Sequence, residues 1–126
     1  YAMQGVDLIL NVTNWVASDK PSEDGRLTEA VCVANAYMNA VFIAAADRIG
    51  VERGQPFLGM SMIVSPSGEL SGGPASYDGE EIVYAECNLS EARLRKRKTR
   101  LNHIILDRRT DVYDALLGYG EIPFNW

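Results

Sequence analysis

One stretch near the start of the chain constrains the fold more than any other: residues 5–15, with the sequence GVDLILNVTNW. It is apolar for most of its length and contains β-branched residues, which predicts a strand covered on both faces rather than an alternating edge strand. Ligands in α/β sheets commonly bind just beyond the carboxyl ends of strands. We therefore predict a pocket wall at Thr13, Asn14 and Trp15. The other interpretation is a strand that runs into an Asn-rich turn, since Asn and Thr are ordinary turn residues.

Length and composition indicate one globular domain, residues 1–126. The longest apolar stretch, residues 41–46, is far too short to span a bilayer, and no signal segment opens the chain. We expect a cytoplasmic protein that does not bind membranes. The net charge of -5 argues against a general nucleic-acid function.

The cysteine and histidine residues are too few and too far apart to match the ligand spacing of a metal site. Cys32 and Cys87 are far apart in apolar settings, and His103 is the single histidine. Both thiols are expected to be reduced core residues, and we predict neither a metal site nor a cofactor.

The first five residues are typical of a helix end, with Gly5 as its C-terminal stop. The chain thus begins inside an element. We interpret it as a cut or processed chain, or as part of a larger protein.

Turn residues and apolar spacing divide the next eighty residues. A helix over residues 26–40 is expected to be mostly buried, with Asn35 and Asn39 binding a strand or loop. Gly59 is expected where another backbone or a ligand comes close. The other expected elements are a loop at 17–25, strands at 41–46, 57–64 and 81–89, a turn at 65–68, a loop at 71–79, and a helix capped by Ser90.

Six cations lie within eight residues, from Arg93 to Arg100. Such a run permits an anionic-partner module. The run lacks interleaved aromatic residues, and the remaining 17 acidic residues exceed the 6 remaining basic ones. We therefore favour a solvated or intramolecularly paired helix face.

The carboxyl end contains two further features. Residues 107–113 place opposite charges close together, which predicts an anchoring cluster. Residues 114–126 carry apolar side chains between Gly118, Gly120 and Pro123, and we expect this tail to dock on a partner subunit.

A search for catalytic residues is mostly negative. There is no phosphate-binding loop and no Ser-His-Asp set with a plausible role for His103. Cys32 lies in the middle of a predicted buried helix, where burial would raise its pKa and hide it. We predict no catalytic residue in this chain.

Four stretches, taken together, resemble a known family. They are GVDLILNVTNW at 5–15, MNAVFIAAADRIG at 38–50, FLGMSMIVSPSGE at 57–69 and DRRTDVY at 107–113. In sequence and order they are similar to the carboxyl-terminal half of the nitrilase, or carbon-nitrogen hydrolase, superfamily, in an amidase-like member. The resemblance covers nearly the whole chain, although no single motif is decisive.

The resemblance implies an α/β fold, half of a four-layer α-β-β-α sandwich with a mixed sheet and flanking helices. It also implies hydrolysis of an amide, carbamoyl or nitrile carbon-nitrogen bond by a Glu-Lys-Cys triad. All three triad residues would precede Tyr1. The expected partners are a small-molecule amide or nitrile, the amino-terminal half of the same protein, and a further copy in a homodimer or higher oligomer.

Residue by residue, the resemblance places Asn14 beside the substrate, with Thr13 and Trp15 flanking it. Arg108, Arg109 and Tyr113 match the closing motif of the family, with a structural role. The family usually has Arg and Glu on the helix where this chain has Asn35 and Met38, so the usual helix contacts are not expected here. A noncatalytic assembly domain derived from the same fold is the alternative function.

Overall fold

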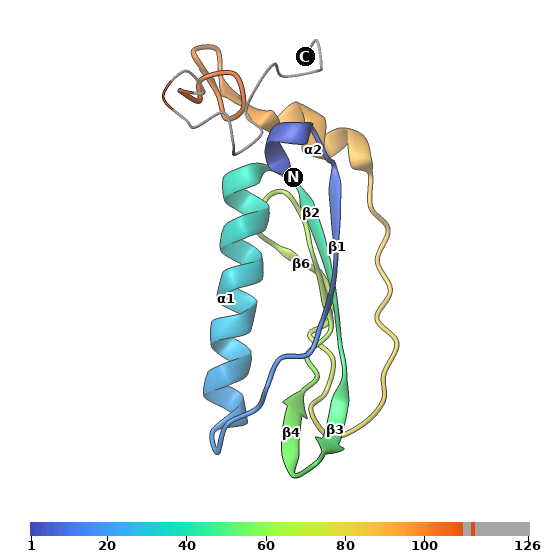
Figure 1. The fold of residues 1–126 in the computed structure, drawn as a ribbon. Coiled ribbons are helices and arrows are strands. Elements are labelled where there is room, and N and C mark those ends of the chain that lie inside the picture. Colours follow the sequence, from blue (N-terminus) through green and yellow to red (C-terminus); the bar gives the residue numbers. More distant parts are fainter. Residues whose placement is uncertain (110–111, 113–126) are drawn as a thin grey trace.

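A four-stranded mixed sheet forms the centre of the protein (Figure 1). The computed structural model describes residues 1–109 and residue 112. The strand order is β1-β2-β5-β6, with β1 and β2 parallel and the other neighbours antiparallel. The mixed sheet with flanking helices confirms the predicted α/β class. The bounds are β1 Leu8–Thr13, β2 Phe42–Asp47, β5 Met62–Val64 and β6 Leu70–Gly72.

The other elements lie around this sheet. A 3-10 turn, η1, ends at Gly5, whose φ of 77° confirms the predicted stop. None of the described helices combines the length and the hydropathy of a membrane-spanning segment. The bounds are η1 Ala2–Gln4, α1 Pro21–Asn39, α2 Leu89–Lys96, and the paired strands β3 Ile49–Glu52, β4 Gln55–Leu58, β7 Arg97–Thr99 and β8 Asn102–His103.

Helix α1 begins earlier than the sequence predicts. The expected loop at 17–25 is wrong in its second half, because Pro21 is the first helical residue and its missing N–H is no loss there. The Asp24 carboxylate accepts a hydrogen bond of 2.7 Å from the Ser18 amide. The Ser18 hydroxyl and, to a smaller extent, this amide lower the pKa of Asp24. This contact stabilises a helix start in a segment that looks like a turn in composition.

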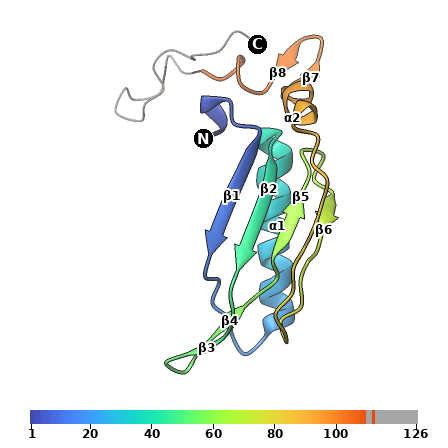
Figure 2. The same cartoon turned by 90° about the vertical axis from the view of Figure 1, so that its right-hand side faces the viewer.

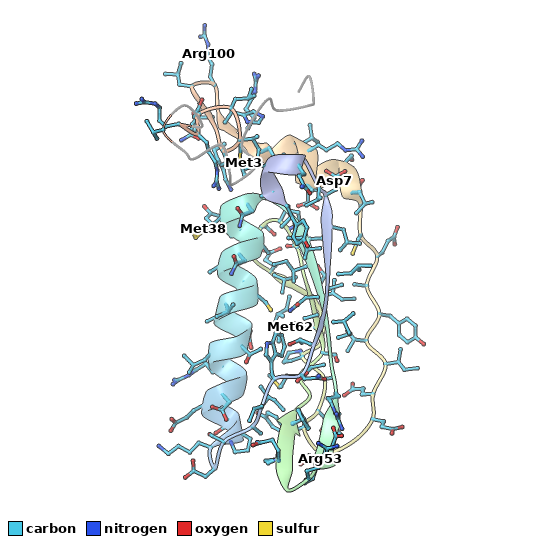
Figure 3. All side chains as sticks on the ribbon, in the orientation of Figure 1. Met3, Asp7, Met38, Arg53, Met62 and Arg100 are labelled. Atoms are coloured by element: carbon cyan, nitrogen blue, oxygen red, sulfur yellow. The ribbon has the colours of Figure 1, made fainter. Side chains whose placement is uncertain are left out.

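Only a narrow stripe of α1 packs on the sheet. Gly25, Cys32 and Ala36 are buried, and their small size lets the helix approach closely. The expectation of a mostly buried helix is wrong: Val31 is 59% exposed and Met38 is 67% exposed. Figure 3 shows Met38 pointing away from the sheet and Met62 lying between sheet and helix.

The opposite face of the sheet is only partly covered. Residues 80–88 run along it in front of β5 and β6 (Figure 2), and a Cβ added at Gly72 would lie 2.8 Å from the carbonyl oxygen of Tyr84. The predicted strand at 81–89 is wrong, because this extended segment lacks ladder pairing. Leu10 and Val12 are 72% and 88% exposed, so the predicted burial of β1 on both faces is wrong within the described residues.

The predicted single strand at 57–64 is broken in two. Gly59 and Met60 have φ values of 71° and 62°, which no strand allows, and they separate β4 from β5. The predicted close approach at Gly59 is confirmed, since a Cβ there would lie 2.9 Å from the carbonyl oxygen of Ser76. The turn at 65–68 is also present, closed by a 2.9 Å bond from the Gly68 amide to the Ser65 carbonyl.

Helix α2 is capped by Asn88, whose side chain accepts from the Ser90 amide, so the predicted Ser90 cap is wrong by two residues. The helix ends at Lys96, before the basic run does. Much of the run is paired within the chain, as favoured above. Arg93 binds Asp7 at 2.8 Å, Arg95 binds Glu91 at 2.8 Å, Lys96 contacts Asp7 at 3.4 Å, and Lys98 lies 4.1 Å above the Tyr37 ring.

The expected role of the two helix amides is confirmed for Asn39 and is wrong for Asn35. Asn35 is exposed, and its side chain donates to the Val31 carbonyl one turn back. Asn39 donates to the Asn35 carbonyl and accepts from Arg108 at 3.3 Å, so only Asn39 binds a distant segment. Tyr113 and the tail at 114–126 lie outside the described residues, as does most of the 107–113 cluster beyond Arg109.

Lys96 joins three segments at the amino ends of β1 and β2. Its side chain is fully buried, and its ammonium donates to the carbonyl oxygens of Val6, Ala40 and Ala92 at 3.3–3.4 Å. Its counter-ion is the carboxylate of Asp7, the residue labelled at the start of β1 in Figure 3. Burial lowers the pKa of Lys96, and Asp7 opposes that shift.

We expect Lys96→Ala to destabilise the fold by about 3–5 kcal/mol, the usual effect of breaking a buried charge pair. Lys96→Met fills the same space and should recover part of the loss. Arg95→Ala is the matched control, because its exposed pair with Glu91 is worth less than about 1 kcal/mol. Urea unfolding followed by circular dichroism measures all three. Equal midpoints for Lys96→Ala and the control would contradict a stabilising role for Lys96.

Candidate functional site

The carboxyl ends of β1 and β2 lie side by side. The two strands are paired in parallel without a register shift, so Thr13 at the end of β1 is opposite Asp47 at the end of β2. Parallel pairing brings polar residues that follow both strands to one edge of the sheet. This edge is where the sequence predicts a pocket wall.

Both backbone polar groups of Trp15 form hydrogen bonds to neighbouring segments. Its amide donates to Oδ1 of Asp47 at 2.8 Å, and its carbonyl accepts from the Leu58 amide at 2.8 Å. Val16 then pairs with Phe57 in a single β-bridge. The segment after β1 is therefore anchored to β2 and β4 and does not form a free turn.

The three predicted wall residues do not face one way. Trp15 is half-buried and lines a groove of about 250 Å³ between β1 and α1, together with Asn11 and Cys32. Asn14 is exposed and follows Leu10 and Val12 in the alternation along β1. Thr13 is half-buried opposite Asp47. The backbone brings the three residues together, while the side chains of Trp15 and Asn14 are separated.

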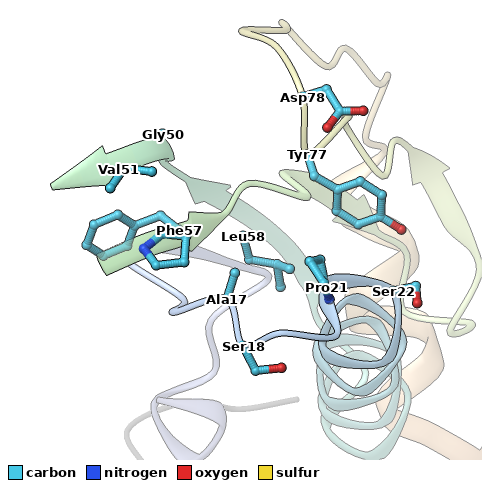
Figure 4. Close-up of a pocket in the computed structure, with 11 residues that line it drawn as sticks. Ala17, Ser18, Pro21, Ser22, Gly50, Val51, Phe57, Leu58, Tyr77 and Asp78 are labelled. Atoms are coloured by element: carbon cyan, nitrogen blue, oxygen red, sulfur yellow. The ribbon is translucent and has the colours of Figure 1, made fainter. Parts of the chain in front are cut away.

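A larger pocket that the sequence does not predict lies beside this segment. Its volume is about 460 Å³. Figure 4 shows its apolar wall at Phe57 and Leu58 and its other side at Pro21 and Tyr77. The signal that could have found it is the aromatic Tyr77 within a Gly, Ser and Pro-rich loop, because loops on a rigid scaffold often carry binding residues.

Besides Tyr77, sequence reasoning missed Asp47. The adjacent Arg48 suggests that the two residues simply form a charged pair with each other. The Arg48 guanidinium instead bonds Glu52 at 2.5 Å and lies 4.2 Å from the Phe57 ring centre. Burial raises the pKa of Asp47, although the backbone amides of Trp15, Arg48 and Gly59 and the charge of Arg48 oppose the rise. When folding raises the pKa of a carboxyl group, its protonated form stabilises the folded state at low pH. This contribution is lost as the pH rises through the folded-state pKa.

The described residues contain no candidate metal centre: none of their His, Cys, Asp and Glu side chains form a group of three that could hold an ion. His103 fixes a turn, since its Nδ1 accepts from the amides of Ile105 and Leu106 at 3.3 and 3.2 Å. Cys32 is 3% exposed, and burial raises the pKa of its thiol. The predicted burial and raised pKa of Cys32 are therefore confirmed.

Comparison with known proteins adds a family to this geometry. The carbon-nitrogen hydrolase family model matches residues 1–97. A nitrilase from Pyrococcus abyssi is 37% identical over 112 residues, which cover 89% of this chain and 39% of that protein. A probable nitrilase from Schizosaccharomyces pombe is 30% identical over 119 residues, covering 93% of this chain and 40% of that protein. The chain thus spans about two fifths of the length of these relatives.

Several solved structures are similar to this chain in fold. A carbon-nitrogen hydrolase from Helicobacter pylori G27 has a TM-score of 0.71 at 26% identity, over 92% of this chain and 42% of that one. The NitFhit protein of C. elegans has a TM-score of 0.69 at 20% identity, over 90% of this chain and 26% of that one. An amidase from Nesterenkonia sp. has a TM-score of 0.57 at 24% identity, over 88% and 35%.

We expect the Cys32 thiol to react slowly with iodoacetamide in the folded protein, because it is buried and its raised pKa keeps it protonated. Cys87 is the internal control, since it is only partly buried. Peptide mapping by mass spectrometry should find Cys87 modified first and Cys32 only after urea is added. Equal labelling of the two thiols in the native protein would contradict the packing of α1 on the sheet.

Proposed function

Because this chain belongs to the carbon-nitrogen hydrolase family, we propose that it is the carboxyl-terminal part of an enzyme that cleaves an amide, carbamoyl or nitrile bond. The family match over residues 1–97 is the observation that carries this proposal. In the proposal, the enzyme is cytoplasmic and its substrate is a small molecule. Thiol catalysis is supplied by a Glu-Lys-Cys triad in residues that precede Tyr1.

The chemistry divides between the two parts of the enzyme. A thiolate attacks the amide or nitrile carbon, Glu transfers protons as general base and then acid, and Lys stabilises the tetrahedral intermediate. The present chain supplies binding and orientation. The segment of Thr13, Asn14 and Trp15 borders the site through the position of its backbone. Trp15 faces the groove beside α1, whereas the Asn14 amide is exposed and available to a substrate.

The uncovered face of the sheet supports an intramolecular partner. Leu10 and Val12 line an apolar hollow of about 430 Å³ with Ala44 and Ile63. Exposed apolar area of this kind is stabilised by burial, at about 25 cal/mol for each Å² removed from water. We propose that the amino-terminal part of the same protein covers this face and completes the four-layer sandwich.

A noncatalytic assembly domain is the second candidate function. The outer face of α1 favours it, because Leu27, Val31 and Met38 recur along one exposed side. The same face fits pairing in a homodimer or higher oligomer, in which the tail at 114–126 docks on the partner subunit. Pairing of Arg93, Arg95 and Lys96 with carboxylates of the chain favours a protein that does not bind nucleic acid.

The test is ammonia release by the full-length protein, with all residues that flank this chain retained. We expect turnover of at least one small amide, nitrile or carbamoyl compound. Asn14→Ala should raise KM about tenfold, the effect of losing a hydrogen bond worth about 1.4 kcal/mol. Asn35→Ala is the matched control, because that exposed amide bonds the Val31 carbonyl of its own helix and no other group among the described residues.

Two results would contradict the proposal in different ways. No turnover of any of the three substrate classes by folded full-length protein would favour the assembly domain. Turnover with an unchanged KM in Asn14→Ala would keep the enzyme but remove Asn14 from the substrate wall. An Asn35→Ala variant as impaired as Asn14→Ala would show that the effect comes from the fold.

A further inference from the structure

The backbone of Trp15 is fixed by two strands that are far apart in the sequence. Oδ1 of Asp47 accepts from its amide at 2.8 Å, across 32 residues. The Leu58 amide donates to its carbonyl at 2.8 Å. Of these contacts, only the one from Asp47 is made by a side chain, so a single substitution can remove it and leave the backbone ladder intact.

Asp47 is itself held rigidly. Its amide donates to Oγ of Ser61 at 3.0 Å, and the same hydroxyl donates to the Asp47 carbonyl at 3.3 Å. Asp47 pairs with Thr13 in the parallel ladder, and its strand, β2, lies between β1 and β5. The carboxylate therefore has a fixed place relative to the centre of the sheet.

The second oxygen of this carboxylate is poorly satisfied. Oδ2 of Asp47 is buried and has no hydrogen-bond partner among the described residues. The adjacent Arg48 guanidinium bonds Glu52 and does not neutralise this oxygen directly. A buried acceptor without a partner is unfavourable, and an Asn could accept from Trp15 without a charge. Features that break such local rules concentrate at functional sites.

We propose that Asp47 is a positioning residue for the substrate wall: it holds the Trp15 amide and so fixes the segment from Thr13 to Trp15 against the ends of β2 and β4. This inference rests on the proposed function for its link to catalysis. Asp47 acts through Trp15 and does not touch the reacting atoms. Its loss therefore weakens substrate binding more than it slows the chemical steps.

The kinetic test compares Asp47→Ala, Asp47→Asn and the exposed control Asp19→Ala in the full-length protein. Asp47→Ala should raise KM about tenfold with kcat within about threefold, both referred to the folded fraction. Asp47→Asn should return KM to near the wild-type value, because its amide oxygen can accept from Trp15. Asp19→Ala should match the wild type. A purely structural role would instead lower the folded fraction and leave KM unchanged, which would overturn the proposal.

A second measurement does not depend on activity. In protein labelled with ¹⁵N-tryptophan, the Trp15 amide resonance is assigned from Trp15→Phe. Its chemical shift should titrate with a midpoint above that of an unperturbed aspartate, because burial raises the pKa of Asp47. Asp47→Asn should abolish this titration, and Asp47→Ala should also move the resonance toward that of a free amide.

The two measurements separate the possible failures. If no substrate is turned over, the proposed function fails, and the Trp15 titration still decides whether Asp47 holds the amide. If the enzyme is active but Asp47→Ala has the wild-type KM, the positioning role is wrong. A Trp15 resonance that does not respond to Asp47 substitution also overturns it. Should Asp47→Ala fail to fold, the titration in wild type and Asp47→Asn supplies the same decision.

Discussion

The fully buried ammonium of Lys96 is the contact on which the arrangement of the sheet depends. It binds carbonyl oxygens from the start of β1, from the junction between α1 and β2, and from α2. A Lys side chain is rarely buried without several partners. By meeting that requirement, Lys96 fixes the amino ends of the two parallel strands and attaches the carboxyl-terminal helix to them.

A half-buried carboxyl group, that of Asp47, fixes the opposite end of the same strand pair. Asp47 binds the segment that follows β1 from its place at the end of β2. Parallel strands are joined by a long crossover, here α1, and their register is not set by a tight turn. Polar contacts at both ends compensate for the missing turn. The site-forming edge thus depends on contacts that are remote from each other in the sequence.

The sequence predicts those features that local chemistry determines. Gly5, Gly59 and the turn at 65–68 behave as predicted because a positive φ or a close backbone approach is a property of the residue itself. The start of α1 was misplaced because the bond from Ser18 to Asp24 converts a turn-like segment into a helix start. Tertiary context also decided the faces of α1 and β1, since periodicity shows which residues share a side but not whether that side is covered.

The candidate site follows the same division. The position of Thr13, Asn14 and Trp15 at a strand end was predictable from the sequence. The resemblance of the chain to its family was also recognisable, from four motifs in the same order. The role of Asp47 was not, because its contact with Trp15 spans 32 residues and its neighbour Arg48 offers a simpler pairing. In this fold the segment proposed as the wall of the site is held by contacts with β2 and β4. We therefore expect substitutions behind Trp15, and not only those facing a substrate, to determine how well the wall binds it.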